Sequence, residues 1–337
     1  MERRTFIKLA AATAALPALG AETAARPKVG PLGKIVGELL PGRYDDHMHV
    51  WGPTPPEPER FRKSIEDAGL VGGALFSGCA GSWHEMWLPC GGKAPKPEKL
   101  MDDVIAWCSA SPTLYPYYWI EPESPSALDE VDMAVEKGIY GFKMMTNRCK
   151  PVSGRTLPVY RRIAKAGKPV LFHTGILWDF EASSDNFRPS AYEGLITVPG
   201  LRFAMGHFSW PWVEECASEF GKFQYATAYL HDKTSELFLD STPGTPESRR
   251  KAAFELVWGM GYETKDRVLF GTDGVADRYN SKRTRDLMKR DDAIFDELGV
   301  DAKLRDSYYR GGLQRLLFGA FAVDDRTDLL PASDARA

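Results

Sequence analysis

Cysteine is scarce in this 337-residue chain, which has five, an odd number, with no pair at Cys-x-x-Cys spacing. A small disulfide-stapled scaffold and a structural zinc finger are therefore excluded. An excess of basic charge is also missing, because 43 Lys and Arg face 46 Asp and Glu, for a net charge of −3. The sequence thus has no electrostatic footprint for nucleic acid, and we expect no such partner.

Long hydrophobic runs are missing as well, which excludes a polytopic membrane protein. The apolar stretch from Leu9 to Gly20 is too short to span a bilayer, and it follows Arg3 and Arg4. This pattern is typical of a cleavable secretory signal and resembles the twin-arginine signal of exported bacterial proteins. We expect residues 1–25 to be removed and the mature protein to be periplasmic or secreted, without a stable membrane anchor. An N-terminal helix of the folded domain is the alternative.

From about residue 43 the chain alternates short apolar runs with amphipathic stretches. Helical periodicity occurs in 126–137, where Leu128, Val131 and Val135 share one stripe, and also in 157–166 and 247–260. The apolar runs predict strands at 44–51, 73–77, 114–122, 139–146, 169–175, 201–209, 223–230 and 267–273. Eight such units predict a (β/α)8 TIM barrel with long βα loops. A doubly wound open sheet is the alternative, but no Gly-rich phosphate turn follows the first strand.

The expected domain organisation follows from these elements. Residues 26–42 form a lead-in, 43–321 the barrel domain and 322–337 a C-terminal tail. No internal repeat or low-complexity linker divides the barrel.

Histidines and a carboxylate stand at the ends of several predicted strands. His47 and His49 point to the same face of the first strand because side chains alternate along a strand. His173, His207 and Asp273 end the fifth, sixth and eighth strands. A barrel core prefers branched apolar residues, so this convergence indicates a metal site at the carboxyl ends of the strands. Imidazoles with a carboxylate suit Zn²⁺ and similar divalent ions.

The order of these residues resembles that of the amidohydrolase superfamily. The phrases YDDHMHVW, GFKMM, VLFHTG and RVLFGTDG resemble its amidohydrolase-related (amidohydrolase 2) branch of metal-dependent TIM-barrel hydrolases. The resemblance covers roughly residues 43–321, although the closing GGLQRLLFG has Leu313-Gln314 where the branch usually carries Asn-Ala. That branch includes hydrolases and non-oxidative decarboxylases resembling aminocarboxymuconate semialdehyde decarboxylase.

The resemblance implies a role for each of these residues. It makes His47, His49, His173 and Asp273 the ligands of one divalent metal ion, for which we expect zinc, and His207 the residue that transfers a proton. In binuclear members of the superfamily the lysine at the position of Lys143 is carboxylated and bridges two ions. A second ion at Lys143 is therefore the alternative to a single one.

Other residues have less specific roles. Asp45 matches the family's aspartate before the paired histidines, and we expect it either to orient a ligand histidine or to make a strand-end hydrogen bond. Arg148 follows the fourth strand, where it either binds a substrate carboxylate or is a solvated loop charge. The aromatics that follow strands, and that are placed to wall an apolar pocket, are Trp83, Trp87, Trp178 and Trp210.

These residues predict an enzyme that hydrolyses an amide, lactone or ester bond of a small molecule. A divalent ion activates water, Asp273 ligates the ion and holds the water's proton, and His207 passes a proton to the leaving group. A metal-dependent decarboxylase of the same fold is the alternative. A non-catalytic binding protein is the third hypothesis, against which the retained ligands argue. Barrels of this branch often dimerise, so a homodimer is also expected.

Overall fold

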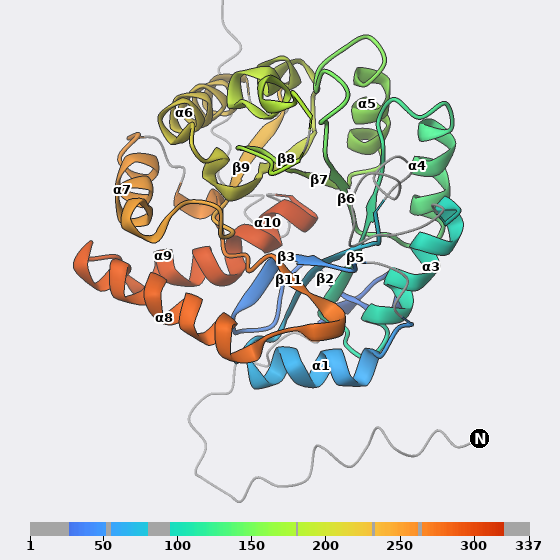
Figure 1. Cartoon of the computed structure of the whole chain (residues 1–337), viewed down its shortest axis with the longest axis horizontal. Helices are drawn as coiled ribbons and strands as arrows, with labels where there is room; N and C mark the ends of the chain where they lie inside the picture. The colour runs from blue at the N-terminus through green and yellow to red at the C-terminus, as the bar shows by residue number, and fades with distance from the viewer. Residues whose placement is uncertain are drawn as a thin grey trace, which may run out of the picture.

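A parallel sheet of nine strands forms the centre of the molecule (Figure 1). The computed structural model describes residues 27–319, except for 52–54, 80–94, 180, 231–232 and 262–264. The order of the strands is β10-β9-β8-β7-β6-β5-β4-β3-β11. Their bounds are β3 (Tyr44–His49), β4 (Gly72–Phe76), β5 (Leu114–Trp119), β6 (Gly141–Met144), β7 (Pro169–Phe172), β8 (Arg202–Met205), β9 (Glu236–Asp240), β10 (Val268–Leu269) and β11 (Gly274–Val275).

The two outermost strands of this order are parts of one interrupted strand that closes the sheet. β10 pairs with β9, β11 pairs with β3, and only residues 270–273 separate them. Across the interruption, the Asp46 amide donates to the Phe270 carbonyl and the Asp273 amide to the His47 carbonyl, both at 2.9 Å. The sheet is therefore the (β/α)8 TIM barrel expected from the sequence, with β10 and β11 together as its eighth strand.

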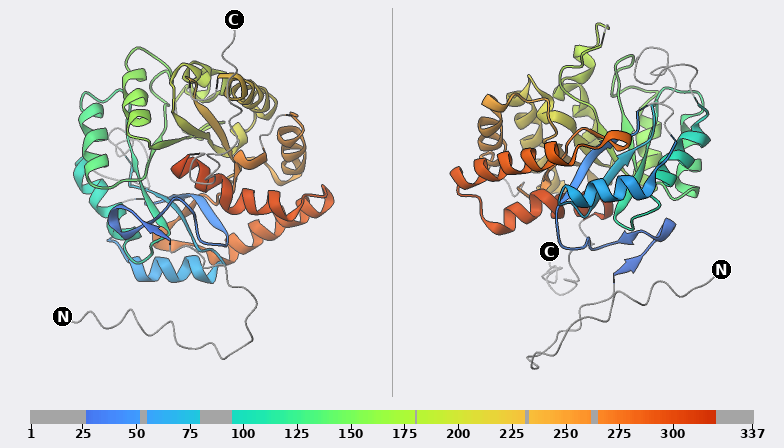
Figure 2. Two further views of the ribbon diagram at one scale, coloured as in Figure 1. Left: turned by 180° about the vertical axis from the view of Figure 1, so that it is seen from behind. Right: turned by 60° about the horizontal axis from the view of Figure 1, so that its bottom comes forward.

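Helices surround the barrel (Figures 1 and 2). In α5, for example, Val159 and Ile163 lie one turn apart and are both buried, as an amphipathic helix requires. The α-helices are α1 (Pro58–Asp67), α3 (Pro97–Cys108), α4 (Ala127–Glu136), α5 (Leu157–Lys165), α6 (Val213–Leu230), α7 (Glu247–Trp258), α8 (Ser281–Glu297), α9 (Ala302–Asp306) and α10 (Gly312–Phe318). The shorter turns are η2 (Pro31–Gly33), η3 (Ser184–Phe187), η4 (Pro189–Thr197), η5 (Gly206–Ser209), η7 (Lys265–Arg267), η8 (Ala276–Arg278) and the π-helix η9 (Ser307–Gly311).

Two elements cover the mouth at the amino ends of the strands. Leu313 and Leu316 of α10 pack with Leu269 and other residues of the barrel interior. The antiparallel hairpin of β1 (Lys28–Val29) and β2 (Ile35–Val36) lies below the barrel in the right-hand view of Figure 2. The Ile35 carbonyl accepts a hydrogen bond from the Tyr115 hydroxyl at 2.8 Å. These two elements do not cover the opposite mouth, at the carboxyl ends of the strands, where the active sites of this fold lie.

The predicted seventh strand, 223–230, is wrong. These residues belong to α6, whereas the seventh strand is β9, Glu236–Asp240. In α6, Phe220 and Phe223 are buried three residues apart, which is helical spacing. The sequence 223–230 is apolar enough for either structure, and the five residues of β9 were too short a run to stand out.

Two other predicted details also differ from the structure. In α4 the buried positions include Val131 and Ala134, whereas Leu128 and Val135 are 40% and 37% exposed. The face is turned because Glu130 is buried, where it accepts a hydrogen bond from Tyr118. The eighth strand, predicted as continuous over 267–273, is interrupted before Asp273, which has a left-handed backbone with φ of 56°.

Two predicted segments, the signal at 1–25 and the tail at 322–337, lie outside the described residues. The first barrel strand begins at Tyr44, and α10 ends at Phe318. Among the described helices, none combines the length and the apolar character needed to cross a membrane.

Candidate metal centre

Three potential ligand side chains meet at the carboxyl ends of β3 and β10. His47 Nε2 lies 3.1 Å from His49 Nε2, and Asp273 Oδ1 lies 3.7 Å from the first and 3.1 Å from the second. Ligand atoms about 2.1 Å from a tetrahedral zinc ion are about 3.4 Å apart, so these spacings suit one ion. The three side chains form a group that could hold a metal ion, with all ligand atoms within 4.8 Å of one another.

The interruption of the eighth strand turns Asp273 toward the histidines. Its left-handed conformation is costly for a residue other than glycine, by about 1–3 kcal/mol, and needs support from its surroundings. That support comes from Asp45, whose carboxylate accepts hydrogen bonds from Thr272 N at 3.0 Å and Tyr279 Oη at 2.8 Å. Asp45 also accepts from the backbone amide of His47 at 3.1 Å. It therefore anchors the backbone on both sides of the group, and its described hydrogen bonds do not include one to an imidazole nitrogen.

Asp240 at the end of β9 makes the contact with the ring of His47. His47 Nδ1 donates to Asp240 Oδ2 at 2.5 Å, since a carboxylate can only accept. The other oxygen, Oδ1, accepts from Thr242 N at 2.6 Å and from the Thr242 hydroxyl. Protonation at Nδ1 leaves the lone pair of His47 Nε2 directed at His49 and Asp273. The sequence analysis missed Asp240 because the seventh strand was misplaced.

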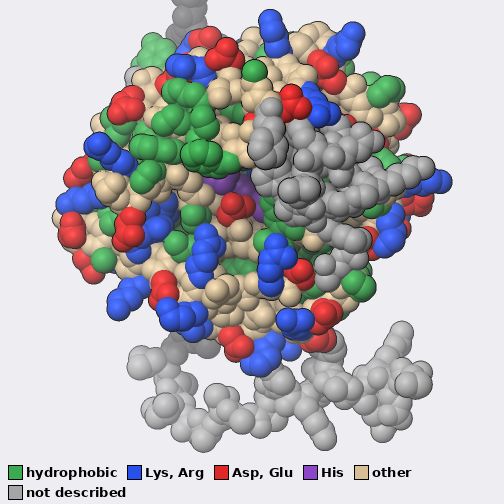
Figure 3. Space-filling view, viewed as in Figure 1, with side chains coloured by type: hydrophobic (Ala, Val, Ile, Leu, Met, Phe, Trp, Pro, Cys, Tyr) green, Lys and Arg blue, Asp and Glu red, His purple; other side chains and the backbone are tan. Residues whose placement is uncertain are grey.

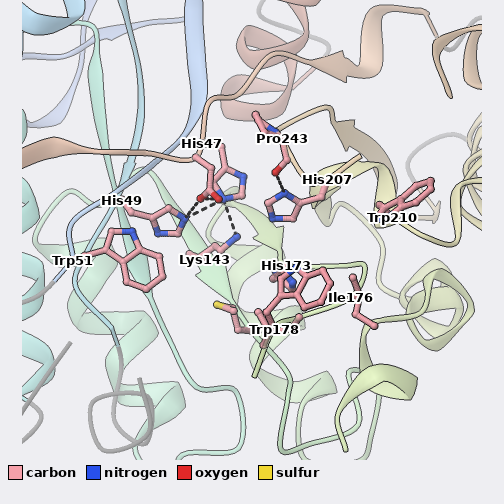
Figure 4. A pocket seen from close by; sticks show the side chains of 14 residues that line it. His47, His49, Trp51, Lys143, His173, Ile176, Trp178, His207, Trp210 and Pro243 are labelled. Carbon is pink, nitrogen blue, oxygen red and sulfur yellow. Dashed lines mark hydrogen bonds and ion pairs between the residues drawn. The ribbon is translucent and has the colours of Figure 1, made fainter. Parts of the chain in front are cut away.

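His173 follows β7, His207 follows β8, and both line the same cavity. The centroids of their rings are 4.8 Å apart, and the centroid of the His207 ring is 5.2 Å from that of the His47 ring. His207 Nδ1 donates to the Pro243 carbonyl at 3.0 Å, so Nε2 is left as an acceptor (Figure 4). His173 lies outside the group of three, and its Nε2 is buried with no hydrogen-bond partner among the described residues.

Lys143 at the end of β6 is fully buried beneath these rings. Its Nζ lies 3.4 Å from His47 Nε2 and 5.0 Å from the centre of the Phe76 ring. Burial lowers the pKa of Lys143 to about 8, against the opposing charges of Asp240, Asp273 and Asp46. The lysine is thus a buried amine surrounded by carboxylates.

The electrostatics favour neutral imidazoles. Burial, with smaller contributions from Lys143 and neighbouring histidines, lowers the pKa of His47 and His173 well below the usual value and also lowers that of His49. Burial acts to raise the pKa of Asp273, but its hydrogen bond with His49, together with the electrostatic influence of the adjacent imidazoles, outweighs it and holds that pKa well below its usual range. Neutral imidazole and ionised carboxylate are the forms that bind a metal ion.

These side chains form the floor of a cavity of about 260 Å³. Figure 3 shows histidines and an acidic side chain at the bottom of a central hollow, with hydrophobic side chains along part of its rim. The described lining residues are His47, His49, Trp51, Lys143, Met145, His173, Ile176, Leu177, Trp178, His207, Trp210, Pro243, Gly244 and Asp273.

The other predicted site residues are placed differently. Trp178 and Trp210 line the cavity, as the sequence suggested. Arg148 is not among the described lining residues, and it forms an ion pair with Glu181 at 3.0 Å. Trp83 and Trp87 lie outside the described residues.

A parallel barrel whose imidazoles and carboxylate converge at the carboxyl mouth has the architecture of the metal-dependent TIM-barrel hydrolases. Residues 45–311 match the family model described as amidohydrolase, and the chain belongs to this family. No curated protein matches the sequence.

Solved structures share the fold at low sequence identity. An amidohydrolase from Burkholderia multivorans with bound zinc is 10% identical, with a TM-score of 0.56 over 82% of this chain and 99% of that chain. A putative amidohydrolase from Staphylococcus aureus is 13% identical, with a TM-score of 0.52 over 82% of this chain and 98% of that chain. Family and fold together make this an enzyme of the hydrolase superfamily.

Proposed function

We propose that the protein is a metal-dependent hydrolase that cleaves an amide, lactone or ester bond of a small molecule. The observation that carries this proposal is the convergence of His47, His49 and Asp273 on the floor of a cavity that His173 and His207 also line. Membership of the amidohydrolase family supports it. A divalent ion bound there would polarise a carbonyl oxygen and lower the pKa of water from 15.7 to near 7.

The proposed ligands are His47, His49, Asp273 and His173. The unpartnered, buried Nε2 of His173 is the observation that favours it as the fourth, because a buried nitrogen without a hydrogen bond is costly unless something binds it. Three imidazoles and one carboxylate are a donor set that zinc accepts, and zinc is bound in the neighbour from Burkholderia multivorans.

Asp273 and His207 are the proposed proton carriers. One oxygen of the ionised Asp273 carboxylate would bind the ion. The other oxygen would accept the proton of the attacking water. The proton on His207 Nδ1 is fixed by the Pro243 carbonyl, so Nε2 is the atom that takes up and releases a proton. From the wall of the same cavity, Nε2 would take up the proton that Asp273 removes from the water and deliver it to the departing amine or alkoxide.

We propose one ion rather than two. A bridging role for Lys143 requires its carboxylation, which replaces a cation by an anion. Asp240 and Asp273 already place negative charge around this lysine, so a further carboxylate is electrostatically unfavourable there.

Metal analysis combined with a substrate screen tests this function. Zinc-loaded protein should contain about one ion per chain and should hydrolyse members of a panel of lactones, esters and amides, whereas chelator-treated protein should not. Release of CO₂ from carboxylates, without hydrolysis of the panel, would instead establish the decarboxylase. Failure to bind any divalent ion would refute both.

We also propose that the chain is exported through the twin-arginine route. The arginine pair and the apolar stretch that follows it support this.

A further inference from the structure

The cavity wall above the histidines is apolar throughout its described part. Trp51 follows β3, Met145 follows β6, Trp210 follows η5 and Pro243 follows β9, while Ile176, Leu177 and Trp178 lie on the segment after β7. Figure 4 shows Trp51 and Trp210 on opposite sides of the histidine cluster. A molecule bound with its reacting group on the floor therefore meets indole and aliphatic surface on the sides.

The described part of this wall provides no cation for a substrate carboxylate. Among the described lining residues, Lys143 is the sole lysine or arginine. Its ammonium lies on the floor, 3.4 Å from His47 Nε2, and carboxylates already surround it. A carboxylate on the wall would be desolvated without a partner, which is costly. The substrate should therefore be uncharged away from its reacting group.

The volume of the described cavity is sufficient for a small ring. An apolar protein cavity of about 150 Å³ binds benzene, and this cavity has about 260 Å³. A single ring therefore fits together with a carbonyl group and a short substituent.

Trp178 is the most unusual residue of the wall, because its side chain is 83% exposed although it is a large apolar ring. It lines the cavity five residues after His173. An indole in this place offers a flat face to an aromatic ring that enters the cavity, and such pairs gain about 0.5–1.5 kcal/mol beyond their buried area.

We propose that the substrate is a neutral single-ring aromatic ester, lactone or amide, and that Trp178 is a specificity-determining residue that contacts its ring. The proposal rests on the hydrolase function in one respect, since it places the scissile carbonyl at His47, His49 and Asp273. The ring preference itself is a binding property and is measurable without turnover.

Binding of three unreactive ketones to the zinc-loaded protein, by calorimetry, tests the ring preference. Acetophenone carries the ring and a carbonyl group, cyclohexyl methyl ketone lacks the aromatic face, and 4-acetylbenzoate adds a carboxylate. Acetophenone should bind about two- to tenfold more tightly than the cyclohexyl compound, from the loss of stacking. It should bind at least about tenfold more tightly than the acid, from the unpaired charge. Equal or tighter binding of the acid would overturn the proposal.

Substitution of Trp178 tests its role. Trp178→Ala should weaken the binding of acetophenone about two- to tenfold and affect the binding of cyclohexyl methyl ketone less. Trp178→Phe should keep most of the preference for the aromatic ketone. Tyr229→Ala is the matched control, because this ring is 68% exposed on α6 and does not line the cavity. If the alanine variants at 178 and 229 bind all three ketones alike, Trp178 has no part in specificity.

Turnover of the matching esters separates this proposal from the hydrolase function. Methyl benzoate should have a higher kcat/KM than methyl cyclohexanecarboxylate or monomethyl terephthalate. Hydrolysis with the opposite order of preference would refute the substrate class and keep the hydrolase. A preserved ketone preference without hydrolysis of any ester, lactone or amide would refute the hydrolase and keep the aromatic site.

Discussion

Asp240 controls how His47 presents its ring. The carboxylate holds the Nδ1 proton at 2.5 Å, so Nε2 remains a lone-pair donor toward His49 and Asp273. Carboxylates that hold a ligand histidine in this way typically contribute 10- to 100-fold to metal affinity. Its partner Thr242 fixes the carboxylate in turn.

Asp240→Ala should therefore weaken zinc binding about 10- to 100-fold, and Asp240→Asn, which keeps an acceptor but loses the charge, should weaken it less. Competition with a chelator of known affinity measures this directly. Asp266→Ala, which removes a carboxylate of η7 at the amino end of β10, is the control. An unchanged affinity in Asp240→Ala would remove any role of this residue in holding the ligand.

His173 and His207 should separate metal binding from proton transfer. His173→Ala removes a proposed ligand and should lower both zinc content and activity. His207→Ala should keep the zinc and lower the rate about 10²- to 10⁴-fold, the usual scale of general acid–base catalysis. Metal content measured alongside kcat for each variant makes the comparison.

The zinc content of Lys143→Ala, measured in the same experiment, distinguishes one bound ion from two. With one ion, its zinc content should match that of the wild type. A loss of half the zinc in Lys143→Ala and in His207→Ala would instead establish two ions and overturn the single-ion proposal. Full activity and full metal in His207→Ala would contradict both arrangements.

Most of the candidate site was accessible to sequence reasoning, because strand alternation and strand ends place His47, His49 and Asp273 by simple rules. Asp240 obeys the same rule, as the last residue of β9. It was missed because recognition of a strand end requires the strand itself to be recognised. The interruption before Asp273 could not be anticipated, since it depends on hydrogen bonds that Thr272 donates to Asp45 across 227 residues of sequence.

At the scale of elements, the incorrect strand at 223–230 shows that an apolar run alone does not distinguish a strand from part of a helix. The first six strands and the eighth were located to within a few residues because each is a short apolar run next to turn residues. By contrast, α6 is an 18-residue helix whose second half is largely apolar, and the strand that follows it, β9, has only five residues. Only packing against β8 and β10 identifies β9 as a barrel strand.

One buried ion pair connects α7 to α8 beside the end of β9. Arg250 and Asp291 are both completely buried, and the guanidinium donates to the carboxylate at 2.6 and 2.7 Å. Arg250 also donates to the Ser241 hydroxyl at 3.1 Å, next to Asp240. The pair thus supports the segment that carries Asp240.

Asp291→Ala should lower the free energy of unfolding by about 3–5 kcal/mol, because it leaves the guanidinium buried without its counter-charge. Urea denaturation followed by circular dichroism measures the change. Glu66→Ala, which breaks the exposed pair with Arg62, is the control and should stay within about 0.5 kcal/mol. A loss in Asp291→Ala no larger than the control would show that the pair does not support this corner of the fold.

At the scale of the whole molecule, the proposed ion joins the first, fifth and eighth barrel strands and should stabilise the fold. Ligand that binds only the folded state adds about 2.7 kcal/mol when its free concentration is 100 times Kd. Chelator-treated protein should therefore melt at a lower temperature than zinc-loaded protein. His173→Ala should reduce this difference in Tm, and Tyr229→Ala should leave it unchanged. Scanning calorimetry at a fixed zinc concentration measures both. An identical Tm with and without zinc would exclude a bound ion at this place.

The proposed export also concerns the whole molecule, because the twin-arginine route accepts proteins that are already folded. This order of events suits a chain whose proposed metal ligands come from strands far apart in the sequence, since a site of this kind exists only after folding. Replacement of Arg3 and Arg4 by lysine keeps the positive charge and removes the planar guanidinium that a receptor can recognise. We expect the variant to accumulate as a cytoplasmic precursor, detected by cell fractionation and immunoblotting, while a single substitution at Lys8 leaves export unchanged. Undiminished export of the double-lysine variant would exclude the twin-arginine route and leave a general secretory signal, in which case the metal site would have to assemble after translocation.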